Sequence, residues 1–152
     1  MNLNSYAHLP ANWPEPIVLT HTAGDVFLTL RAENGFLEAK WTGHISAADV
    51  IKAAQVSIPI LQAMHYQGLL NDKSEVSGEW YEANDWLQYE WMPKAVKAGL
   101  KYLAYVYSSN MLSLYSFRDF RSRIPPELQL RTFHTRTAAK VWLDKKSALI
   151  AP

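Results

Sequence analysis

The sequence predicts one α/β domain in which helices pack against a mixed sheet, with the element order βββαβαβαβα. Its length of 152 residues suits a single domain. The first 42 residues contain β-rich runs and the turn dipeptide Asn34-Gly35, which is typical of a hairpin. From residue 43 onward, short apolar runs alternate with helical patterns, and this alternation indicates parallel strands joined by helices.

The opening strands are expected at residues 17–22, 26–32 and 36–42. The first two runs are separated by Ala-Gly-Asp, and Asn34-Gly35 favours a tight turn into the third run. We therefore expect three antiparallel strands at the start of the domain.

The first helix is expected to begin after Ser46, which has the character of an N-cap, with Asp49 in the first turn. Apolar residues follow at helical spacing as far as Leu61. Pro59 is expected to bend or divide this helix, because proline removes a backbone donor and clashes with the preceding turn.

A short buried strand is expected at residues 68–71, followed by an aromatic-rich helix that begins at Ser77 or Asn84 and is capped by Gly99. The remaining elements are a strand, a helix, a strand and a last helix capped by Thr135. The first three of these are expected at residues 101–107, 110–124 and 128–133.

Composition excludes several classes of protein. Hydrophobic residues make up 49% of the chain and charged residues 19%, which is a globular composition. The absence of cysteine excludes disulfides, thiolate nucleophiles and cysteine-ligated zinc. No signal peptide or membrane-spanning run is recognised, so a cytoplasmic location is expected. The expected domain covers residues 17–146, between an irregular segment at 1–16 and a tail at 147–152.

Charge is distributed unevenly along the chain. Residues 1–92 hold four basic and eleven acidic side chains, a formal charge of −7, whereas residues 93–152 hold eleven basic and three acidic side chains, a charge of +8. This asymmetry indicates an acidic partner, a homodimer through opposite halves, or a compact fold that interleaves the halves. The arginines match no nucleic-acid reader pattern, so nucleic acid is not an expected partner.

The richest chemical feature is a set of large rings in the predicted second helix, which cannot all lie on one helical face. We expect them to bind a small apolar molecule or a protein partner, or simply to fill the layer between helix and sheet. The set consists of Trp80, Tyr81, Trp86, Tyr89 and Trp91.

No catalytic residue, metal site or cofactor is predicted. The histidines show no His-x-x-x-His spacing, and neither a Gly-x-Ser-x-Gly elbow nor a glycine-rich phosphate loop is present. Asp72 and His134 form the best speculative polar pair, because both are expected just after strand ends, where open α/β sheets bind ligands. The alternative is that they are ordinary polar groups in loops.

Residues 91–104, WMPKAVKAGLKYLA, resemble a Trp-x-Pro-x-Ala, Gly-x-Lys pattern found in the SpoIIAA-like proteins of bacteria, a branch of the STAS-type folds. Residues 43–49 resemble that family's entry to its first helix, and residues 130–143 resemble its ending. The resemblance spans roughly residues 17–145 and implies a small α/β domain used for regulation or ligand carriage rather than catalysis.

In the anti-sigma-factor antagonists of the wider group, a serine in an Asp-Ser-x-Gly-like turn accepts phosphate, so the resemblance implies a possible phosphate or anion site at Ser77. This chain departs from that turn, because Ser77 precedes Gly78 only in a shifted alignment. The acidic residues Glu75, Glu79 and Glu82 would also repel phosphate. The alternative for Ser77 is an N-cap or loop hydroxyl.

The expected function is therefore that of a non-catalytic binding or regulatory domain that carries a small apolar or lipid-like ligand. The alternative is a partner-switching regulator that docks on another protein without the usual phospho-acceptor serine motif.

Overall fold

A computed structural model describes residues 8–107 and 111–150 of the chain, and it contains a six-stranded mixed sheet in the order β1-β2-β3-β4-β5-β6. Neighbouring strands pair antiparallel from β1 to β3 and parallel from β3 to β6. The α/β fold with a mixed sheet is thus confirmed. The strands are β1 (Ile17–Thr20), β2 (Val26–Glu33), β3 (Phe36–His44), β4 (Gly68–Ser77), β5 (Tyr102–Val106) and β6 (Gln129–Phe133).

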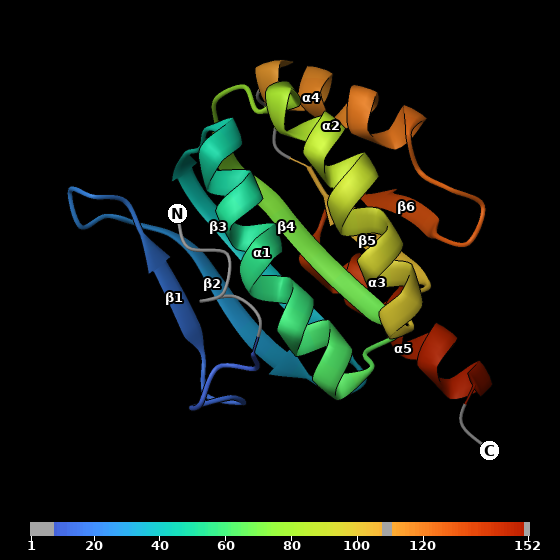
Figure 1. Cartoon of the computed structure of the whole chain (residues 1–152). Coiled ribbons are helices and arrows are strands. Elements are labelled where there is room, and N and C mark those ends of the chain that lie inside the picture. Colours follow the sequence, from blue (N-terminus) through green and yellow to red (C-terminus); the bar gives the residue numbers. More distant parts are fainter. Residues whose placement is uncertain (1–7, 108–110, 151–152) are drawn as a thin grey trace.

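Helices cover both faces of this sheet (Figure 1). Helix α1 (Ala47–Met64) and helix α3 (Met92–Ala98) lie on one face, and α5 (Arg136–Ile150) lies on the other. The larger core lies on the α1 side and includes Phe117 and Phe120 of α4 (Met111–Ser122). A smaller core lies between the sheet and Trp142 of α5. A sheet with two covered faces explains why the interior strand β5 is apolar on both sides.

Helix α1 begins as the sequence predicts. The Asp49 N–H donates to Ser46 Oγ over 3.3 Å, and the Ser46 N–H donates to Asp49 Oδ2 over 2.9 Å, which completes a capping box. Of the two effects expected of Pro59, division of the helix is wrong, because α1 continues through Pro59 to Met64, and bending stays a prediction. The neighbouring Ile60 and Leu61 are buried in the larger core, and this burial offsets the backbone hydrogen bond that proline removes.

Strand β4 is longer than predicted. It ends at Ser77 rather than at Asn71, because its second half continues to pair with β3, with Thr42 opposite Glu75 and His44 opposite Ser77. Accordingly, no helix begins at Ser77.

The aromatic segment that follows β4 is an irregular helix. A 3₁₀ turn, η2 (Tyr81–Ala83), leads into α2 (Asn84–Trp86), a π-helical turn, η3 (Leu87–Trp91), and then α3. Gly99 ends α3 at a φ of 111°, as expected of a C-cap.

The later elements lie within a few residues of their predicted positions. The Ala138 N–H donates to Thr135 Oγ1 over 3.2 Å, which confirms the cap of the last helix. Parts of three expected segments lie outside the described residues. These are residues 1–7 of the irregular start, the beginning of the predicted helix at 110, and residues 151–152 of the tail.

The two oppositely charged halves of the chain meet within the fold. Arg136 donates hydrogen bonds to Glu38 and, over 3.2 Å, to Glu33. Arg123 forms ion pairs with Asp85 and Asp119. Basic side chains of the second half therefore neutralise acidic side chains of the first half inside one domain. Within the described ranges, no helix has the length and hydropathy needed to cross a bilayer.

Candidate functional site

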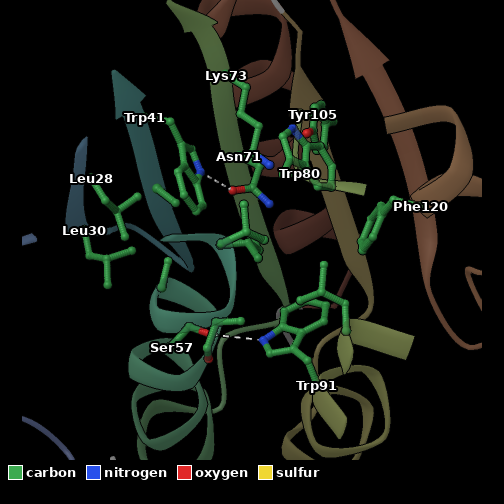
Figure 2. A pocket seen from close by; sticks show the side chains of 16 residues that line it. Leu28, Leu30, Trp41, Ser57, Asn71, Lys73, Trp80, Trp91, Tyr105 and Phe120 are labelled. Carbon is green, nitrogen blue, oxygen red and sulfur yellow. Dashed lines mark hydrogen bonds between the residues drawn. The ribbon is translucent and has the colours of Figure 1, made fainter. Parts of the chain in front are cut away.

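A cavity lies between the sheet and the helices on the α1 side (Figure 2), and its walls come from β2, β3, β4, β5, α1, the aromatic segment and α4. The centre of a water-sized molecule can occupy about 50 Å³ of it, and the side chains leave about 520 Å³ between them when the part open to solvent is included. Most of the wall is aliphatic or aromatic, and only a few polar groups interrupt it. This combination is typical of small-molecule sites.

Two indole rings of the wall are held by hydrogen bonds (Figure 2). Trp41 Nε1 on β3 donates to Asn71 Oδ1 on β4 over 2.8 Å. Trp91 Nε1 donates to Ser57 Oγ of α1 over 3.0 Å, and the Ser57 hydroxyl donates in turn to the Ala54 carbonyl over 2.7 Å. These bonds connect β3 to β4 and η3 to α1, and they fix the orientation of both rings.

Two other polar atoms of the wall have no partner within the described part of the chain. They are Trp80 Nε1 and Tyr105 Oη, and both atoms are buried. Trp80 is 1% exposed and Tyr105 is 3% exposed. Burial raises the pKa of the Tyr105 hydroxyl well above its ordinary value, which keeps it protonated. A buried donor without an acceptor costs about 1–3 kcal/mol, so each of these groups calls for an explanation.

Lys73 projects from β4 into this aromatic environment and is only 3% exposed. Its Nζ atom lies 3.5 Å from the ring centroid of Trp80, 4.7 Å from that of Trp41 and 5.4 Å from that of Tyr105. Figure 2 shows Lys73 between Trp41 on one side and Trp80 and Tyr105 on the other. Among the residues that the structure describes, no hydrogen bond or ion pair holds this amine.

Burial and the surrounding rings act on the Lys73 proton in opposite directions. The ring faces favour the ammonium form, by about 2 kcal/mol when the contact is desolvated. The loss of hydration opposes it by several kcal/mol for a buried ion. The larger effect wins, so burial lowers the pKa of Lys73 well below its ordinary value. The group is therefore predisposed to be a neutral amine with a free lone pair.

The neighbouring carboxylate of Asp72 does not serve as a counter-ion for Lys73. Consecutive residues of a strand point to opposite faces of the sheet. Asp72 accepts hydrogen bonds from the Ser74 hydroxyl over 2.6 Å and from Lys40 Nζ over 3.4 Å. Its charge is thus compensated by residues other than Lys73.

The structure separates the five aromatic residues singled out in the sequence. Trp80 and Trp91 line the cavity. Trp86 packs, partly buried, against the larger core. Tyr81 and Tyr89 are 41% and 71% exposed. Only two of the five rings therefore meet at this site.

The other predicted polar residues lie elsewhere. Ser77 is the last residue of β4, and its hydroxyl lies 3.2 Å from His44 Nδ1. Its expected role as a helix N-cap is wrong, because the strand continues through it. The His134 ring lies 3.2 Å from the Tyr107 hydroxyl. Within the described residues, no hydrogen bond or ion pair joins Asp72 to His134.

Sequence reasoning missed Trp41, Ser57, Lys73 and Tyr105 as residues of the site. The sequence pattern places Lys73 in a turn, because it predicts a strand that ends at Asn71. One signal in the sequence favours the longer strand, since no glycine or proline interrupts residues 69–77 between Gly68 and Gly78. In the described ranges, no cluster of three or more histidine or acidic side chains is placed to hold a metal ion.

Neither a scan against protein-family models nor a search of curated proteins finds a match to this chain. A search of solved structures finds an uncharacterised protein from the DUF3478 family of Shewanella loihica PV-4, described as having a SpoIIAA-like fold. The two chains are 17% identical with a TM-score of 0.45, and the match covers 76% of this chain and 91% of the other. That description names the fold that the sequence motifs resemble, and it names no ligand, partner or reaction.

Proposed function

We propose that this protein binds a small, largely apolar, ring-containing molecule with one polar acceptor group in the cavity between the sheet and α1. The observation that carries the proposal is a pair of donors in the wall, Trp80 Nε1 and Tyr105 Oη, that find no partner among the described residues. A ligand that accepts a hydrogen bond from either donor would remove a desolvation cost that the protein otherwise bears. Five aromatic residues around the cavity supply the apolar contact that such a ligand needs.

The competing explanation is that these rings only fill the core. Protein interiors are close-packed, and their buried polar groups are nearly always paired. Here, space remains between the side chains, and two polar atoms of the wall are unpaired within residues 8–107 and 111–150. The unpartnered amine of Lys73 adds a third polar group at the same place. A cavity with three such groups supports ligand binding better than simple packing.

The proposal can be tested with benzyl alcohol, which has one ring and one hydroxyl. We expect it to quench or shift tryptophan fluorescence and to raise Tm, because Trp41, Trp80 and Trp91 line the site. Native mass spectrometry of freshly purified protein would show any natural occupant as a mass that disappears on denaturation.

A matched pair of variants makes this test specific. Ala54 of α1 lines the cavity, whereas Ala48 lies exposed on the same helix. Ala54→Phe should abolish the response to benzyl alcohol, and Ala48→Phe should leave it intact. Equal responses in the two variants, or no response in the unmodified chain, would contradict the proposed cavity.

A second candidate function is docking on a protein partner, and exposed tyrosines favour it. Tyr81 and Tyr115 contact each other edge to face at 5.8 Å while both are largely exposed, and Tyr89 is also exposed. Aromatic side chains of this kind are enriched at interfaces. Replacing Tyr81 and Tyr115 together by serine should dissociate a heteromeric complex isolated from cells that naturally make the chain. Persistence of that complex would contradict docking through these rings.

A further inference from the structure

We propose that the occupant of this cavity is an aldehyde or ketone, and that the Lys73 amine condenses with its carbonyl group to form a reversible imine. This inference rests on the proposed cavity and names the chemical class of its ligand. It assigns to Lys73 a covalent role that simple hydrophobic binding does not require.

The placement of the amine carries the inference. Lys73 lies in β4 directly after Asp72, which pairs with Lys40 of β3 and with Val106 of β5, and it falls where the pairing of β4 with β3 is irregular. Its Nζ atom is held 3.5 Å from the Trp80 ring centroid, and no described residue occupies its lone pair with a hydrogen bond or ion pair. An amine that is desolvated among aromatic rings in an apolar cavity is the arrangement that imine-forming lysines need.

Charge also favours a carbonyl ligand over a carboxylate. A carboxylate would bring one charge into the cavity and would require Lys73 to carry another, and both charges would lose their hydration. A carbonyl compound and a neutral amine place no charge in the cavity. At pH 7 an exposed lysine is neutral in only roughly 1 molecule in 2,500. Because burial lowers the pKa of Lys73, its neutral and nucleophilic fraction is larger.

The reaction balances without an oxidant or a reductant. The nitrogen lone pair forms a bond to the carbonyl carbon, and the π electrons of the C=O bond move to oxygen, which takes up a proton. The nitrogen loses its two protons, the C–O bond breaks, and one water leaves as the C=N bond forms. Tyr105 and Trp80 line the same cavity with unpartnered donors, which suits them to hydrogen bond the carbonyl oxygen before it departs.

The test uses benzaldehyde on the intact chain at pH 7, with cyanoborohydride to reduce the imine to a stable benzylamine. Peptide mapping then measures the benzyl label on each lysine. We expect at least a tenfold excess on Lys73 over the exposed residues Lys97 and Lys101. Lys73→Met should remove this label, and Ala54→Phe should remove it while Lys73 is retained. Ala48→Phe should label like the unmodified chain.

The outcomes separate this inference from the proposed function. Binding of benzyl alcohol without preferential labelling of Lys73 would overturn the imine and leave the cavity standing. If benzyl alcohol does not bind and Lys73 is not preferentially labelled, both the proposed cavity and the imine are overturned. Uniform labelling of the lysines would also overturn the imine. Tight binding of benzoate that excludes benzaldehyde would overturn it too, and would favour an anionic ligand.

Discussion

The burial of Lys73 predicts an unusual pH dependence of stability. In the folded chain its pKa is lowered by burial, whereas in the unfolded chain it has the ordinary value of about 10.4. Between these two values, the unfolded chain binds a proton at Lys73 that the folded chain does not bind. The free energy of unfolding therefore rises with pH through this window, and it falls as the pH decreases towards the folded pKa.

Lys73→Met removes the side chain that binds this extra proton in the unfolded chain. Methionine retains an unbranched apolar chain that can pack against the rings of Trp80 and Trp41. One proton corresponds to about 1.4 kcal/mol per pH unit inside the window. We therefore expect the variant to be more stable than the unmodified chain at neutral pH. This advantage should shrink with rising pH by up to about 1.4 kcal/mol per unit within the window.

Urea unfolding at intervals from pH 6 to pH 9 measures the difference directly. Tyr105, a titratable side chain near Lys73, has a pKa that burial raises, and it stays protonated over this range. Lys97→Met serves as the matched control, because Lys97 is exposed and should leave the pH dependence unchanged. Parallel stability curves for the unmodified chain and Lys73→Met would show that Lys73 does not have a depressed pKa, and they would refute the reasoning.

Two further predictions concern packing, and urea unfolding tests both. Gly78 and Gly24 have nearly equal φ angles of 101° and 100°. A Cβ atom added at Gly78 would lie 2.3 Å from the Ile45 carbonyl oxygen, whereas a Cβ atom added at Gly24 would have no other atom within 4 Å. Gly24→Ala should cost about 1 kcal/mol and Gly78→Ala at least about 3 kcal/mol; equal losses would contradict the steric argument. Ser57→Ala should cost about 1–3 kcal/mol by leaving the Trp91 indole N–H without its acceptor. Adding Trp91→Phe should then cost less than it does in the unmodified chain, and strictly additive losses would contradict that coupling.

Element ends were predictable from the sequence where the stabilising contacts are local. Ser46 and Asp49 cap α1 through bonds that span three residues. Thr135 caps α5 in the same way, and Gly99 ends α3 because its φ of 111° suits glycine. Each of these signals lies within one turn of the element that it ends, so no tertiary information is needed.

The second half of β4 and most of the cavity could not be predicted in that way. Glu75 belongs to a strand because it pairs with Thr42, which lies far away in sequence. Trp41, Lys73 and Tyr105 meet only through the order and register of three parallel strands. Side chains that a sheet brings together leave no periodic pattern in any one segment.

The π turn at Leu87–Trp91 has a consequence for the comparison of related sequences. A π turn accommodates one residue more than an α turn of the same extent, so it corresponds to a single-residue insertion in a helix. The side chains before and after it follow two helical phases that differ by about 100°. Deleting one residue within η3 would restore a continuous α-helix and rotate the preceding residues relative to Trp91, which bonds Ser57. In an alignment of relatives, a one-residue gap at this place would therefore distinguish chains that keep this cavity wall from chains that have lost it.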